Sequence, residues 1–198
     1  KAHLGKIDDS LTRALCWSAA WDMLRDAEIS ATDFIDIALA GLPGEDDIAT
    51  VTIIANQLVT AVELYSAPTK RDSARLKVGN AYEQMLKASA AGSDHQLQFA
   101  RNFTSFAASA EHNDLIKELL DGKLSGLKVD ADLRWSFVIS LAERGLMDKA
   151  ALSAELLKDN TLTGALSHAT ALAALPTAEA KSDTWKSITT EEISTSQR

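Results

Sequence analysis

Apolar residues recur at helical spacing along almost the whole chain, and this periodicity is the feature that most restricts the fold. Between residues 47 and 65, one face of a helix would be formed by Ile48, Val51, Ile54, Leu58 and Val62. Only 3 prolines and 9 glycines interrupt the 198 residues, in which alanine and leucine dominate. No alternating β-branched run and no Asn-Gly hairpin signal is present. The sequence therefore predicts an all-α protein.

Capping and turn residues divide this pattern into about ten helices. The expected ranges are about 10–26, 30–40, 47–65, 71–90, 93–110, 113–121, 131–144, 149–158, 161–174 and 177–185. Helices of this length joined by short turns favour stacked antiparallel pairs, as in an α-solenoid of the HEAT or armadillo type. No exact sequence period is visible, so any repeat is structural and degenerate. We expect one helical-repeat domain over residues 1–190 and a polar tail over residues 191–198.

The acidic balance excludes several classes of partner. The formal net charge is −8, whereas nucleic-acid binding needs clustered Lys and Arg. No basic amphipathic stripe favours a membrane surface, no apolar run approaches the roughly 20 residues of a bilayer-spanning helix, and no signal peptide opens the chain. A single cysteine, Cys16, fits a reducing compartment. We expect a cytoplasmic protein and, because the polar opening begins with Lys1 rather than Met, a piece of a longer polypeptide.

The segment RALCWSAAWDMLRD, residues 13–26, predicts a helix that is buried on two sides. On a wheel of about 100° per residue, its apolar residues cover well over half the circumference, which is more than a one-sided helix needs. Trp17 and Trp21 are successive rungs of one face. We predict that both, together with Trp135 in the helix expected over 131–144, are core packing residues.

Two arginines fall inside apolar arcs of their helices. Arg13 opens the 13–26 segment, and Arg134 precedes Trp135 in DLRWSFVISLAERG. A buried guanidinium needs an acid, helix-end carbonyl groups or an escape to water. Two interpretations stay open: a structural ion pair or snorkelling side chain, and a lining residue of a cavity that receives an anionic group.

Motifs for self-contained catalysis are absent from the sequence. No histidine is followed by Glu and no two histidines lie at i, i+3 or i+4, so the chain lacks the His-Glu-x-x-His zinc motif. Gly-x-Ser-x-Gly, the phosphate-binding Gly-rich loop and Gly-x-Gly-x-x-Gly are also missing. Ser125 and Lys128 match Ser-x-x-Lys only formally, because its helix-opening context and partner motifs are lacking. We expect no catalytic residue and no metal site within this chain.

Carboxylates cluster at residues 8–9, 45–47 and 191–192. The first two clusters lie at expected helix starts, where the helix dipole favours negative charge, and the third lies in the tail. Capping or solvation is therefore predicted for all three, rather than general acid–base chemistry.

Three stretches in combination resemble a known family. They are LTRALCWSAAWDMLRDAEISATDFIDIAL, DADLRWSFVISLAERG and AELLKDNTLTGALSHATALAALPTAEAKSDTWKSI. Together they are similar to the C-terminal helical domain of bacterial aminopeptidase N, closest to actinobacterial members, and to the related domain of the endoplasmic-reticulum aminopeptidases. The resemblance runs from about Leu11 to Ile188.

This resemblance implies a parent zinc metallopeptidase that removes N-terminal amino acids from peptides. Its zinc ligands, general-base glutamate and Gly-Ala-Met-Glu-Asn motif would lie in an upstream catalytic domain, so this chain would hold no cofactor and be inactive alone. The family's C-terminal domain is a HEAT-like bowl that packs on the catalytic domain and encloses the cavity for peptide substrates. Polar residues that would be candidates for cavity or interdomain contacts are Arg13, Asp22, Arg25 and Arg134.

Two functional hypotheses follow from these observations. The first is the accessory domain of a zinc aminopeptidase. The second is a freestanding helical-repeat scaffold that binds another protein through its concave face. A reading frame with His-Glu-x-x-His fused ahead of Lys1 would favour the first, and a start codon near Lys1 the second.

Overall fold

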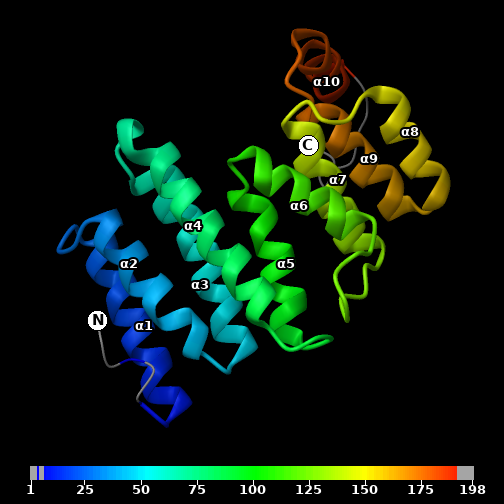
Figure 1. The fold of residues 1–198 in the computed structure, drawn as a ribbon. Coiled ribbons are helices and arrows are strands. Elements are labelled where there is room, and N and C mark those ends of the chain that lie inside the picture. The colour runs from blue at the N-terminus through cyan, green and yellow to red at the C-terminus, as the bar shows by residue number, and fades with distance from the viewer. Residues whose placement is uncertain (1–3, 5–6, 191–198) are drawn as a thin grey trace. The chain divides into compact units, whose positions relative to one another are not determined.

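Every regular element that the structure describes is a helix (Figure 1). The structure is a computed structural model, and it describes Leu4 and residues 7–190. In this part of the chain the ten α-helices are α1 (Ser10–Arg25), α2 (Ala31–Gly41), α3 (Ile48–Thr60), α4 (Pro68–Ala88), α5 (Asp94–Phe106), α6 (Ala110–Leu120), α7 (Ala131–Glu143), α8 (Lys149–Lys158), α9 (Leu162–Ala174) and α10 (Ala178–Thr190). A 3-10 turn, η2 (Leu42–Gly44), follows α2, and a π-helical turn, η3 (Ala61–Tyr65), follows α3. The predicted all-α class is confirmed, and the expected tail over 191–198 lies outside the described residues.

Side-chain caps begin several helices within one residue of the starts that the sequence predicts. The carboxylate of Asp9 accepts the amide N–H of Thr12 at 2.8 Å, and the hydroxyl of Ser30 accepts that of Asp33 at 3.1 Å. Because the first amides of a helix lack intrahelical acceptors, these local hydrogen bonds fix where each helix starts.

Several helix boundaries differ from the sequence prediction. The start of α6 is Ala110 rather than about residue 113, and α10 extends to Thr190 rather than to about residue 185. The start of α4 is Pro68 rather than about Arg71, because the first turn of a helix tolerates a residue without an N–H group. The end of α5 is Phe106 rather than about Ala110. There Ala107 adopts an extended conformation while remaining buried, which interrupts the helix without exposing apolar surface.

The chain divides into two compact units. The first unit comprises residues 1–112 and 125–127, and the second comprises residues 113–124 and 128–198. The division falls within α6, whose first residues belong to the first unit.

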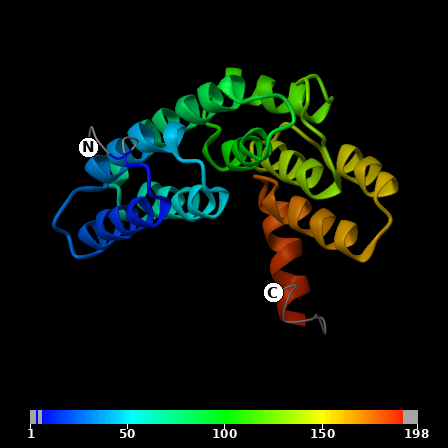
Figure 2. The same ribbon diagram turned by 90° about the horizontal axis from the view of Figure 1, so that it is seen from below.

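The first unit consists of two layers of helices. Helices α1, α3 and α5 pack in sequence order as one layer, while α2 packs against α4 in the other (Figure 2). Its core includes Phe34, Leu58, Tyr82, Phe103 and Phe106, all of which are buried. The rings of Tyr82 and Phe106 stack with centroids 5.4 Å apart.

One segment of the first unit, Ile48–Tyr65, has the length and composition of a membrane-spanning helix. Within the structure it packs as a core helix, because Val51, Ile54 and Leu58 are fully buried against its neighbours. Packing inside the first unit therefore accounts for the apolar residues on one face of this segment, whereas Ile53 and Leu64 are exposed.

The second unit packs α7, α8 and α10 around α9. Its core cluster consists of Trp135, Val138, Ala142, Leu152, Ala171, Leu175 and Ala180. The cluster takes residues from all four helices or their ends, so each of them buries one face.

The first helix, α1, buries one stripe rather than the predicted two sides. Its buried residues are Arg13, Trp17, Ala20 and Leu24, which follow one another at helical spacing. Leu11 and Leu15 are instead 67% and 63% exposed. The expectation of two-sided burial is wrong for the described residues, because α2 and α3, the helices that pack against α1, leave these leucines exposed.

Candidate functional site

The Arg13 side chain is buried in the first unit and ends in a cluster of acceptors. Its Nη2 donates to Glu45 Oε1 at 3.0 Å, and it also pairs with the exposed carboxylate of Asp46. Its Nη1 donates to the carbonyl oxygens of Ile7 and Asp8 at 2.9 and 3.0 Å. The guanidinium thus has both the acid and the carbonyl groups that its burial requires.

Glu45 is the residue that sequence reasoning misjudged. Asp47, its neighbour in the 45–47 cluster, caps α3 as predicted, but Glu45 folds inward. Its Oε2 accepts the indole N–H of Trp17 at 2.9 Å, and its Oε1 accepts the amide N–H of Asp47 at 3.2 Å. Burial alone would raise the pKa of Glu45, but the hydrogen bonds from Arg13, Trp17 and Asp47 hold that pKa below its ordinary value.

A sequence signal for this role of Glu45 existed. An arginine in an apolar arc needs an acid, and a run of three consecutive acids at 45–47 supplies more carboxylates than one helix cap uses. The pairing of positions 32 residues apart could not be read from local pattern.

The second unit contains a related cluster around Arg134. Its Nε donates to Glu155 Oε2 at 2.7 Å, its Nη2 donates to Glu155 Oε1 at 2.9 Å, and its Nη1 donates to the Leu120 carbonyl at 3.1 Å. This is a two-pronged arginine–carboxylate pair with a helix-end carbonyl beside it. Burial would raise the pKa of Glu155, but Arg134 and Lys158 keep it below its ordinary value.

The tryptophan beside Arg134 uses a different carboxylate. Trp135 Nε1 donates to Asp159 Oδ2 at 2.9 Å, and Asp159 follows the last turn of α8. Gly164 allows Asp159 to lie close to the start of α9, because a Cβ at position 164 would lie 2.1 Å from the Asp159 carbonyl oxygen. In the first unit Gly41 likewise allows a close contact, here with a tryptophan ring, since a Cβ at that position would lie 2.5 Å from the Trp17 ring.

The predicted packing residues take up different degrees of burial. Trp17 and Trp135 are buried in the cores of their units. Trp21 is half-buried and places its ring edge-to-face with Phe34 at 5.4 Å and Tyr65 at 6.0 Å. Trp21 therefore covers the edge of the first core rather than filling its centre.

The other two predicted contact residues lie on the surface of α1. Asp22 and Arg25 form an i, i+3 pair at 3.6 Å, with side chains 59% and 58% exposed. A pair so exposed contributes little to stability, so both side chains are accessible from solvent. The structure brings neither of them into the Arg13 cluster.

A groove of about 580 Å³ adjoins the Arg13 cluster in the first unit. Its apolar floor includes Leu39, Met85 and Phe99, and its rim includes Asp46 and His95. The Nε2 atom of His95 lies 2.8 Å from the carbonyl oxygen of Glu45. This hydrogen bond connects the groove rim to the backbone of the residue that neutralises Arg13.

The grouping of potential metal ligands bears on whether the described residues could form a zinc site. Among Leu4 and residues 7–190, no three or more His, Cys, Asp or Glu side chains gather in a group that could hold a metal ion. The carboxylates of the two arginine clusters are already committed to guanidinium and indole N–H groups. Neither cluster has the spare ligands that a zinc site requires.

The described part of the chain is therefore all-α and forms two units, each with an arginine–glutamate pair that joins segments distant in sequence. The whole chain, residues 1–198, matches the model of the ERAP1-like C-terminal domain, and the chain belongs to that family. It is also 43% identical over 188 residues to a protein named "Aminopeptidase N" from Streptomyces lividans. That alignment covers 94% of this chain and 22% of the relative, so the chain spans about a fifth of the relative's length.

Proposed function

We propose that this chain is the non-catalytic C-terminal domain of a zinc-dependent aminopeptidase N, in which it encloses the substrate cavity and packs on an upstream catalytic domain. The observation that carries this proposal is the 43% identity to Streptomyces lividans "Aminopeptidase N" along 94% of the chain. In this proposal, zinc and the peptide-cleaving residues belong to the parent's catalytic domain, the substrates are peptides, and the parent is cytoplasmic.

The packing order of the helices supports a HEAT-like or armadillo-like arrangement. Within the first unit α3 packs against α5 and α2 against α4, and within the second unit α7 packs against α9. Packing between alternate helices is what stacked helical pairs produce. We propose that residues 1–190 work as one helical-repeat domain on this principle.

The uncovered side of α1 supports contact with another domain. Leu11 and Leu15 are exposed on α1, which also carries the solvent-accessible pair Asp22 and Arg25. Apolar side chains with polar neighbours are typical of surfaces that are covered in an assembly. We assign this surface of α1 to the interface with the catalytic domain.

The role of Arg134 in the parent follows from its partial exposure. Its side chain is 30% exposed while it holds Glu155, so it can face a cavity and still stabilise the second unit. We propose that Arg134 both faces the substrate cavity and stabilises the second unit. Arg13 is almost fully enclosed, so we propose that it acts on the interdomain surface by positioning the start of α1.

The experiment compares full-length parent enzymes that carry Arg134→Met, Asp22→Lys/Arg25→Glu, or neither change. Hydrolysis is measured on a leucine chromogenic substrate and on peptides of increasing length. A second assay measures the association of separately expressed catalytic and C-terminal domains. We expect the Asp22/Arg25 double variant to weaken this association. We expect Arg134→Met to change the dependence of kcat/KM on peptide length.

Three results would count against these proposals. A change in thermal stability alone for Arg134→Met would contradict its cavity role. Unchanged association of the Asp22/Arg25 double variant would contradict the α1 interface. Specific binding of this chain to an unrelated protein, without affinity for the catalytic domain, would favour a freestanding scaffold.

A further inference from the structure

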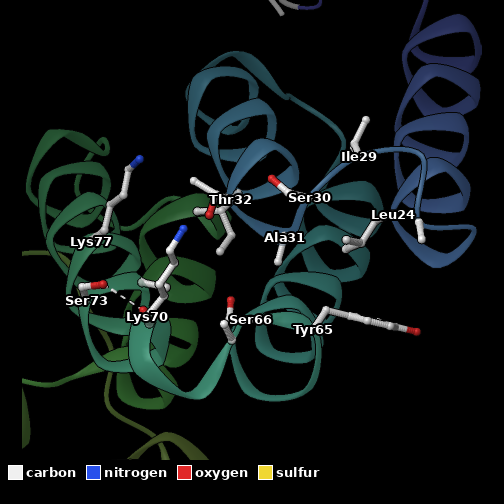
Figure 3. A pocket seen from close by; sticks show the side chains of 14 residues that line it. Leu24, Ile29, Ser30, Ala31, Thr32, Tyr65, Ser66, Lys70, Ser73 and Lys77 are labelled. Carbon is white, nitrogen blue, oxygen red and sulfur yellow. Dashed lines mark hydrogen bonds between the residues drawn. The ribbon is translucent and has the colours of Figure 1, made fainter.

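The first unit contains a second cavity, of about 560 Å³, which we call the lysine pocket. Its walls come from the end of α1, the first turn of α2, the end of η3 and the first turns of α4 (Figure 3). Its volume lies within the range of small-molecule sites. The lysine pocket shares no lining residue with the groove beside Glu45.

The charge of this pocket differs from that of the whole chain. The chain has 28 acidic and 20 basic residues, yet the 14 lining residues include two lysines and no carboxylate. Lys70 and Lys77 are seven positions apart on α4 and so lie on the same face of the helix. The pocket rim therefore presents two ammonium groups to one volume.

The two lysines are not equivalent. Lys77 forms an ion pair with Asp36 of α2, which neutralises much of its charge. Within the part of the chain that the structure covers, Lys70 has no such carboxylate partner, and its ammonium extends toward the start of α2, where Thr32 and Ser30 lie (Figure 3). Lys70 is therefore the cation that remains available for a ligand.

Within the described part of the chain, a neutral side chain with a free hydroxyl donor, that of Thr32, lines the pocket beside Lys70. The hydroxyl of Ser30 is committed to Asp33, because it accepts the Asp33 amide N–H as the cap of α2 and donates to the Asp33 carboxylate. Below these hydroxyl groups the floor is apolar, formed by the buried side chains of Leu24 and Ile35. The Lys70 ammonium and the Thr32 hydroxyl above an apolar floor are complementary to a carboxylate attached to a hydrocarbon body.

We propose that the lysine pocket binds a small organic carboxylate, with its anionic group on Lys70 and Thr32 and its apolar body against Leu24 and Ile35. The site lies within the first unit and needs neither zinc nor a catalytic domain. Its existence is thus independent of the function proposed above.

The test uses the 198-residue chain, labelled with 15N, and titrates it with hexanoate and with the neutral analogue hexanamide. We expect saturable amide shifts at Ala31, Thr32 and Lys70 with hexanoate and none at these positions with hexanamide. Acetyl-Leu-Glu-Leu-amide, whose only carboxylate is a side chain, provides a second arm. It distinguishes a site for free acids from a site for acidic peptides.

Variants on one helix locate the binding charge. Lys70→Gln should weaken hexanoate binding about tenfold, since a hydrogen bond to a charged group is lost. Lys87→Gln is the matched control, because Lys87 lies on α4, pairs with Glu83 and does not line the pocket. Its affinity for hexanoate should be unchanged.

Three results would overturn the proposal. They are the absence of saturable shifts with both the acid and the acidic peptide, equal binding of hexanoate and hexanamide, and undiminished affinity in Lys70→Gln. Spectra of each free variant show whether the fold is intact, so a loss of binding is not confused with unfolding.

Discussion

The two arginine clusters differ in how they supply acceptors to an arginine and a neighbouring tryptophan. In the first unit the side chains of Arg13 and Glu45 are 6% and 1% exposed, and Glu45 serves both the guanidinium and the indole of Trp17. In the second unit Arg134 and Glu155 are 30% and 10% exposed, and Trp135 has its own acceptor in Asp159. In the first cluster one carboxylate accepts hydrogen bonds from both the arginine and the tryptophan, and in the second cluster each of them has its own carboxylate.

The stability of a unit should therefore depend more strongly on a single glutamate when that glutamate is buried and when both an arginine and a tryptophan use its carboxylate. Replacing Glu45 removes the buried counter-charge of a guanidinium that has little access to water and leaves it only the exposed carboxylate of Asp46. It also alters the acceptor of Trp17. Replacing Glu155 leaves a partly exposed guanidinium and an intact Trp135 hydrogen bond. Breaking a buried ion pair costs far more than breaking an exposed one.

The largest expected effect is that of Glu45→Gln. We expect it to lower the free energy of unfolding of the first unit by about 3 kcal/mol, because the Arg13 guanidinium loses its buried counter-charge. Hydrogen–deuterium exchange of amides in α1 and α3, compared with those in α7 and α9, measures this for each unit separately. Glu28→Gln, at an exposed position, is the matched control. Equal exchange in Glu45→Gln and wild type would mean that Arg13 does not need this partner.

The next effect concerns the glycines beside the two tryptophans. Gly164→Ala places a Cβ against the Asp159 backbone carbonyl, which is held by its own chain, and we expect a loss of about 2 kcal/mol in the second unit. Gly41→Ala meets the edge of the Trp17 ring, which can move by a few tenths of an ångström only by straining its hydrogen bond to Glu45, and we expect about 1 kcal/mol. Urea unfolding of both variants gives the comparison, and a larger cost at Gly41 would reverse our ranking of the two contacts.

A smaller effect is expected for Glu155→Gln. Because Arg134 is partly exposed and keeps the Leu120 carbonyl, the loss should be about 1 kcal/mol, or a third of that for Glu45→Gln. Exchange of amides in α7 and α9 reports it, with Glu143→Gln as an exposed control on α7. A cost equal to that of Glu45→Gln would show that exposure does not separate the clusters.

Acid sharpens the same comparison with the smallest expected change. The folded-state pKa values of Glu45 and Glu155 lie below their ordinary values, so their ionised forms stabilise the fold above about pH 5. This contribution is lost as the pH falls through the folded-state pKa of each group. The stability gap between wild type and Glu45→Gln should therefore shrink between pH 5 and about pH 3. A gap that is constant over this range would contradict the assigned protonation states.

Local features of the fold were predictable and tertiary ones were not. The caps Asp9 and Ser30 mark their helices because a capping bond joins residues three positions apart. The π-helical turn Ala61–Tyr65 has no comparable local signal. For the same reason the sequence indicated that Arg13 and Arg134 each need an acid, helix-end carbonyl groups or an escape to water, whereas only the fold identifies Glu45 and Glu155 as the acids that they contact.

The most direct test of the account is a peptidase assay of this chain by itself. The purified 198 residues are incubated with leucine p-nitroanilide and short peptides, with added zinc and with a chelator. We predict no hydrolysis above the buffer rate under either condition, because we propose that the residues that cleave peptides lie in the parent's catalytic domain and not in this chain. Saturable hydrolysis that requires zinc and disappears with the chelator would contradict the account.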